Sequence, residues 1–107
     1  MSRSLTLILT TVPNRTVGRK LADTLLREKR AACVAILPGI ESHYVWKGKR
    51  EKSGECQLLI KTLKSQFRAV VTAIRQHHPY ECPEILQIPV TAEWKPYGDW
   101  IRSGCGS

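Results

Sequence analysis

The chain has 107 residues, a length that suits one domain built around one hydrophobic core. Hydrophobic residues make up 42% of it, which excludes an intrinsically disordered chain because enough apolar surface is available to offset the entropy lost on folding. No apolar run approaches the roughly 20 residues that a membrane helix needs, and the stretch before Pro13 lacks the cleavage pattern of a signal peptide. We therefore expect a single domain over residues 1–107, located in the cytoplasm and without a membrane partner.

The formal net charge of +8 raises nucleic-acid binding as a hypothesis. Basic residues cluster over 27–30, at the end of a predicted helix, where cations complement the helix dipole. A second cluster over 47–52 lies at a predicted hairpin tip, where charge keeps strand ends soluble. Both clusters have a structural explanation, so the sequence argues against a nucleic-acid partner.

Four cysteines, Cys33, Cys56, Cys82 and Cys105, are separated from one another by more than 20 positions. They form no CxxC pair, which excludes a zinc ribbon and a thioredoxin-type redox motif. Cys33 and Cys56 fall inside apolar runs that resemble strands. We expect these two to be buried free thiols rather than disulfide partners.

The first predicted elements are a strand and a helix. Residues 5–11 alternate in the manner of a strand. Asn14 or Thr16 can cap the helix that follows, since apolar positions recur at helical spacing from Val17 and the pattern ends near Arg30.

A long hairpin is predicted next. Residues 32–46 read as one strand with a bulge or kink at Pro38-Gly39. A tight turn over 47–49 leads to a return strand over 55–62.

The second helix has Ser65 as a candidate N-cap and an apolar face that begins with Phe67. Pro79 should end it at His78, because the residue before a proline is pushed out of helical geometry. A fourth strand over 84–91 and a short amphipathic C-terminal segment complete the chain.

The order strand, helix, strand, strand, helix, strand predicts an α+β, ferredoxin-like βαββαβ sandwich with a short C-terminal helix. The first and third strands are apolar on both sides, as at Leu7 and Ile8 or Leu58 and Leu59, which is typical of strands covered on both faces. The two long helices can cover only one face. The pattern therefore predicts an oligomer that covers the other.

A set of segments runs in order along nearly the whole chain. They are residues 28–34, 37–39, 44–49, 60–62, 77–80 (His77-His78-Pro79-Tyr80), 83–85 and 86–90. This ordered set resembles the CutA family of divalent-cation tolerance proteins. The resemblance implies a ferredoxin-like subunit packed as a homotrimer through sheet contacts, and a link to tolerance of copper and other divalent metals through binding of Cu(II).

The adjacent histidines are candidate metal ligands, because neutral imidazole suits copper, zinc and nickel. Neighbours on a helix point about 100° apart, so His77 and His78 can share one ion only if the last turn opens or a second subunit completes the site. The alternative is that a histidine at a helix C-terminus caps carbonyl groups and complements the dipole.

The resemblance implies that this pair belongs to the family's copper site. Thr10 stands where some bacterial members are described as having a cysteine ligand, and a hydroxyl is a poor copper ligand beside a thiolate. Cys82 is the nearest thiol in sequence and could substitute, although an ordinary loop cysteine is the favoured interpretation. His43 is predicted to be a surface or core histidine rather than a ligand.

A second candidate site is a cleft between subunits, near strand ends. Aromatic residues there could simply fill an interface, and Lys61 could simply pair with Glu84. Its residues are Tyr44, Trp46, Lys61, Glu84, Tyr97 and Trp100.

The sequence shows no nucleophile–base pair, glycine-rich phosphate loop or interpretable carboxylate pair, so we expect no enzyme. The leading hypothesis is a homotrimer that binds Cu(II) or another divalent cation weakly, with no cofactor required for folding. The alternative is a trimeric signalling or scaffold protein that binds a small ligand or partner protein in clefts between subunits.

Overall fold

The computed structural model describes residues 3–106 and has the element order that the sequence predicts. A short 3-10 turn, η1 (Lys64–Gln66), precedes the second helix. The strands are β1 (Leu5–Val12), β2 (Cys33–Trp46), β3 (Lys49–Leu63) and β4 (Leu86–Pro89), and the helices are α1 (Arg15–Arg27), α2 (Phe67–His77) and α3 (Lys95–Gly104).

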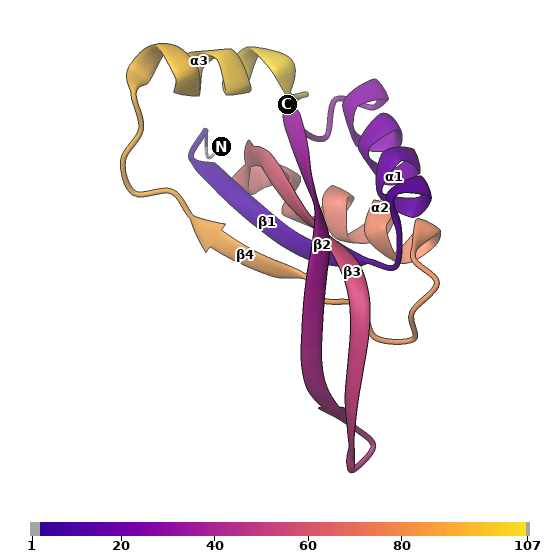
Figure 1. Cartoon of the computed structure of the whole chain (residues 1–107). Coiled ribbons are helices and arrows are strands. Elements are labelled where there is room, and N and C mark those ends of the chain that lie inside the picture. Colours follow the sequence, from indigo (N-terminus) through magenta and orange to yellow (C-terminus); the bar gives the residue numbers. More distant parts are fainter. Residues whose placement is uncertain (1–2, 107) are drawn as a thin grey trace.

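The four strands form one antiparallel sheet in the order β2-β3-β1-β4. Helices α1 and α2 lie together on one face of this sheet, as Figure 1 shows, and α3 lies apart at one end. This arrangement confirms the predicted α+β, ferredoxin-like class. Within residues 3–106, no helix is both long and apolar enough to cross a membrane.

The core fills the space between the sheet and the two helices. Ile8 of β1 lies opposite Ile60 of β3, and both side chains are fully buried. Leu21 and Leu25 of α1 and Ile74 of α2 pack against them from the helix side. Truncating one such side chain to alanine costs about 2–5 kcal/mol, so this layer fixes the sheet on which the site is built.

Helix α1 begins at Arg15 because Asn14 caps it. The Asn14 side chain accepts a hydrogen bond from the Val17 amide at 2.9 Å, which satisfies one free donor of the first turn. The helix ends at Arg27, earlier than expected, because Lys29 turns the chain with a positive φ of 58°.

The second helix departs from the prediction at its start. Ser65 lies inside η1 and does not cap α2, which begins at Phe67 without a side-chain cap. At the other end the prediction is confirmed. His78, the residue before Pro79, has extended backbone angles of φ −94° and ψ 131°.

The hairpin is longer than predicted. Strand β3 begins at Lys49 instead of residue 55, and the ladder with β2 continues to the turn formed by Lys47 and Gly48. A bulge between Leu37 and Ile40 confirms the expected irregularity at Pro38-Gly39. Beyond this bulge the paired segments 40–46 and 49–55 project past the rest of the sheet, and we call them the hairpin arm (Figure 1).

Strand β4 is shorter than the predicted 84–91. It pairs with β1 only from Leu86 to Pro89, on an edge of the sheet. Beyond Pro89, one more backbone bond to β1 runs from the Val90 amide to the Leu5 carbonyl at 3.3 Å.

All four cysteines are free, and their burial differs. Cys56 is buried, as predicted, whereas Cys33 is only half-buried because it lies on the edge strand β2. Cys82 is exposed and Cys105 is half-buried.

The face of the sheet turned away from α1 and α2 carries apolar side chains, and we call it the open face. Leu7, Leu9 and Leu59 lie on it by register. At its β4 edge Leu86 and Ile88 are 55% and 45% exposed. Within residues 3–106, α3 covers one end of this face by packing Ile101 against Leu5 and Leu63.

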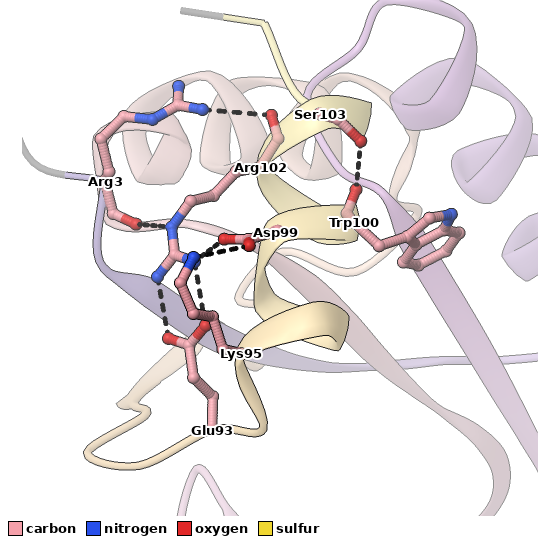
Figure 2. Close-up of polar contacts among 7 residues, drawn as sticks. All are labelled: Arg3, Glu93, Lys95, Asp99, Trp100, Arg102 and Ser103. Carbon is pink, nitrogen blue, oxygen red and sulfur yellow. Dashed lines mark hydrogen bonds and ion pairs between the residues drawn. The ribbon is translucent and has the colours of Figure 1, made fainter.

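A polar clasp holds α3 in place (Figure 2). The Arg102 guanidinium donates to both carboxylate oxygens of Glu93, at 2.8 and 2.9 Å, and to Asp99 at 3.1 Å. Its Nε also donates to the backbone carbonyl of Arg3 at 3.0 Å, and the Arg3 side chain donates back to the carbonyl of Arg102. The clasp therefore joins the start of β1 to the last helix.

Candidate functional site

A cavity lies between the hairpin arm and the loop that follows α2. We call it the hairpin groove, with a volume of about 710 Å³. Its principal side chains are Tyr44, Trp46, Glu51 and Glu55 from the arm and Tyr80, Glu81, Cys82 and Glu84 from the loop.

Tyr80 joins the two walls of the groove. Its hydroxyl donates to a carboxylate oxygen of Glu55 at 3.0 Å. Burial of the ring edge and this bond to Glu55 raise the pKa of Tyr80 to about 12. On the arm, Ser53 donates to the Tyr44 hydroxyl at 3.3 Å. Tyr80 and Tyr44 thus present fixed phenol groups toward the cavity.

The groove is acidic although the chain is basic. Four glutamates line it, at positions 51, 55, 81 and 84. Gln57 donates to Glu84 at 3.1 Å and also to the carbonyl of Thr10 at 2.9 Å, which fixes that carboxylate against β1. The Lys47 ammonium lies 3.9 Å from Glu81 and neutralises only one of the four carboxylates. The lining therefore favours a positively charged ligand.

His78 lies behind the groove with both ring nitrogens engaged. Its Nε2 donates to the carbonyl of Thr11 at 2.5 Å, and its Nδ1 accepts a hydrogen bond from the Tyr80 amide at 3.1 Å. This pair of bonds fixes the neutral tautomer that carries its proton on Nε2. His78 thereby attaches the end of α2 and the loop to β1.

The other predicted ligands do not gather around His78. His77 is exposed at the last position of α2. Thr10 is fully buried on the helix side of β1, and its hydroxyl has no hydrogen-bond partner within residues 3–106. No three His, Cys, Asp or Glu side chains in that range lie close enough to hold a metal ion.

A copper ion therefore does not fit this trio within one chain. Nδ1 of His78 could bind a metal only by giving up the Tyr80 amide, and Nε2 only by giving up the Thr11 carbonyl. The His77, His78 and Thr10 assignment stays a prediction that needs a second subunit or a rearranged loop.

The predicted inter-subunit cleft falls in two places within one chain. Tyr44, Trp46 and Glu84 line the hairpin groove. Lys61 and Tyr97 instead lie at the far end of the open face, beneath α3.

At that end, the Lys61 ammonium donates to the Tyr97 hydroxyl at 3.1 Å, and this bond raises the pKa of Lys61. The Tyr97 ring stacks on Trp100 with centroids 5.7 Å apart. Lys61 and Glu84 therefore have separate partners and do not pair with each other.

His43 is exposed, as predicted for a surface histidine. Its Nε2 lies 2.7 Å from a carboxylate oxygen of Glu41.

Sequence reasoning missed the contacts of Tyr80 and Glu55, although Tyr80 belongs to the His77-His78-Pro79-Tyr80 segment. A lone glutamate and a lone tyrosine 25 positions apart give no pattern until the chain folds.

Comparison with known proteins gives a consistent result. The family model described as CutA1 divalent ion tolerance protein matches residues 6–104. A divalent-cation tolerance protein CutA from Pectobacterium atrosepticum is 42% identical over 96 residues, which is 90% of this chain and 87% of that protein.

A chloroplastic CutA from Arabidopsis thaliana is 41% identical over 96 residues, and this chain spans about half of it (53%). The crystal structure of CutA1 from Oryza sativa superposes with a TM-score of 0.94 at 35% identity, covering 98% of this chain and 96% of that one.

Proposed function

Because the chain belongs to the CutA1 family of divalent-ion tolerance proteins, we propose that it is a homotrimer that binds divalent cations weakly and contributes to metal tolerance. The observation that carries this proposal is the acidic lining of the hairpin groove. Carboxylate oxygens attract divalent cations, and four of the nine acidic residues of this basic chain line this cavity.

Weak binding follows from the partners that the polar groups already have. Glu55 accepts from Tyr80, Glu84 accepts from Gln57, and both nitrogens of His78 are engaged. A cation must compete with these bonds. Of the two histidines at the end of α2, His77 is the exposed one, which favours Cu(II) over harder ions at that position.

Calorimetric titration with Cu(II) and with Mn(II) tests the proposal. We expect Glu51→Gln/Glu84→Gln to weaken Mn(II) binding and His77→Ala to weaken Cu(II) binding. Asp23→Asn/Glu28→Gln is the matched control for the glutamate pair, because it removes two carboxylates at α1, outside the lining of the groove. Heats that are the same for all variants and for wild type would refute a site at either place.

The homotrimer is proposed to form through the open face. Leu86 and Ile88 expose large apolar side chains there, and such a patch marks an interaction site. Ile88→Glu places a charge in this interface, whereas Thr72→Glu places the same charge on the exposed side of α2. Light scattering should give a trimer mass for wild type and Thr72→Glu and a smaller mass for Ile88→Glu. A monomer mass for wild type at micromolar concentration would refute the trimer.

The aromatic lining of the groove favours the alternative function, a signalling or scaffold protein that binds a small organic ligand. Tyr44, Trp46 and Tyr80 offer ring faces beside carboxylates, which suits an organic cation. If a tetraalkylammonium ion changes the tryptophan fluorescence in a saturable manner and divalent metals do not, this alternative is favoured.

We propose no catalytic role. The cytoplasmic location stays a prediction, since one relative is named as chloroplastic.

A further inference from the structure

The outer side of the helix layer carries a band of exposed cations. Helices α1 and α2 lie on one face of the sheet (Figure 1). Their buried side chains pack into the core, and the remaining positions of each helix are largely exposed. We call this band the basic face. Its exposed cations are Arg15, Arg19 and Lys20 of α1, Lys64 of η1, and Arg68 and Arg75 of α2.

Few acidic groups balance this face. Within α1, η1 and α2 the only acidic residue is Asp23, and the Arg27 guanidinium pairs with it at 2.5 Å. Glu28 follows as the C-cap of α1. In the part of the chain that the structure describes, none of the six cations of the basic face forms an ion pair with a carboxylate.

The basic face is distinct from the two basic clusters that are visible in the sequence. Those clusters lie at 27–30 and 47–52, and both have structural explanations. The basic face consists of other residues, spaced along two helices that lie side by side only in the fold. Like charges held together without partners repel one another, and a polyanion relieves that repulsion.

The side chains favour phosphate over a lipid surface. Four of the six cations are arginine, whose planar fork matches phosphate oxygens in a bidentate manner. A membrane-binding helix also exposes large apolar residues on the side that meets the lipid. Among the described residues of these two helices, Leu26 is the one large apolar side chain that is exposed. Little apolar surface could therefore insert into a lipid layer.

The absence of stacking groups favours a duplex over a single strand. Single-strand binders stack bases on exposed aromatic rings. The one aromatic residue of these helices, Phe67, is half-buried against the core. The 13 residues of α1 span roughly 20 Å, a length over which a DNA duplex presents about a dozen phosphates.

We propose that the basic face binds the phosphate backbone of duplex nucleic acid without reading its sequence. This face lies on the side of the sheet opposite the open face, so association through the open face leaves it accessible. A homotrimer would present three such faces and bind more tightly through multiple attachment.

Fluorescence anisotropy with a random-sequence DNA duplex of about two helical turns tests this proposal. The test variant is Arg19→Gln/Arg68→Gln/Arg75→Gln. The matched control, Lys49→Gln/Arg50→Gln/Lys52→Gln, removes the same charge from the hairpin arm. We expect wild-type affinity to fall as salt rises, and the test variant to lower the slope of log affinity against log salt by about 2–3, since each lost phosphate contact removes about one. The control should keep the wild-type slope to within about one.

Three results would overturn the proposal. Equal losses in both variants would mean that net charge alone attracts the duplex. Tighter binding to the single strand of the same sequence would contradict the duplex assignment. Binding to phosphatidylserine vesicles with no duplex complex at low salt would identify a lipid surface instead. Circular dichroism of both variants confirms that each is folded.

Discussion

Tyr80 is the residue on which the geometry of the groove most depends. Its hydroxyl bonds to Glu55 across the cavity, and its amide bonds to His78 behind it. The loop after α2 is thus attached to the hairpin arm and, through the His78 ring, to β1. Neither attachment follows from sequence spacing, because each joins segments that are far apart in the chain.

Tyr80 should make stability depend on pH in the alkaline range. Between its ordinary pKa of 10 and its folded value of about 12, the unfolded chain has released the Tyr80 proton while the folded chain keeps it. Stability should therefore fall as pH rises through that range. Tyr80→Phe should remove this part of the pH dependence, measured by urea unfolding, together with the tyrosinate absorbance step near pH 12.

Glu55→Gln separates the causes of that shift. It keeps Tyr80 but removes the carboxylate, so the absorbance step should move to lower pH. An absorbance titration identical to wild type would contradict the role of Glu55.

The two histidines should differ in their contribution to stability. His78→Ala removes the donor to the Thr11 carbonyl and the acceptor of the Tyr80 amide, which should cost about 1–3 kcal/mol. His77→Ala, at an exposed position, should stay within about 0.5 kcal/mol of wild type. Urea unfolding measures both, and equal costs would contradict the structural role of His78.

Among the elements, α3 depends most on one glycine. A Cβ at Gly98 would lie 1.4 Å from Oε2 of Glu93, so only glycine leaves room for the carboxylate that Arg102 grips. The ion pairs of the clasp also stabilise the charged forms of Arg102 and Asp99. The bond to Glu93 raises the pKa of Arg102, and the bond from Lys95 lowers the pKa of Asp99.

Gly98→Ala should lower the thermal midpoint by a few degrees, because the Glu93 carboxylate must leave the clasp. Glu93→Ala should lower it by a similar amount. If both act on the same bond, the double variant should be no worse than the poorer single one. Additive losses in thermal unfolding monitored by circular dichroism would show that the two changes act independently.

The elements that the sequence predicts well are those whose periodicity reflects burial. Helix α1 repeats because one side of it faces the core. Strand β1 alternates because its leucines share the open face, while Thr6, Ile8 and Thr10 share the side toward the helices. The start of β3 was missed because residues 49–54 are polar and largely exposed on the arm, where no buried face imposes a pattern. Ser65 was misassigned because η1 begins the helix in place of a side-chain cap.

At the scale of the whole molecule, the fold could be predicted and the arrangement of the site could not. The order of elements determines the ferredoxin-like topology. The proposed cleft residues, however, divide between the groove and the end of the open face, because β2 and β3 carry Trp46 and Lys61 to opposite ends of the hairpin. Only a second subunit could bring these two groups together.

The proposed association through the open face should make stability depend on concentration. If assembly stabilises the folded chain, the thermal midpoint should rise with protein concentration, by mass action. Ile88→Glu should abolish this dependence, and Thr72→Glu should retain it. Scanning calorimetry at several concentrations measures the effect, and a constant midpoint for wild type would contradict coupled assembly.

The hairpin arm reaches past the sheet with both strands largely exposed. A two-stranded ribbon is marginally stable by itself in water, and few buried apolar contacts hold this one. Its backbone amides should therefore exchange with deuterium much sooner than those of Ile8 and Ile60 in the core. If a neighbouring subunit packs against the arm, exchange there would slow, so the protection of these amides would give a residue-level record of how long subunits stay together.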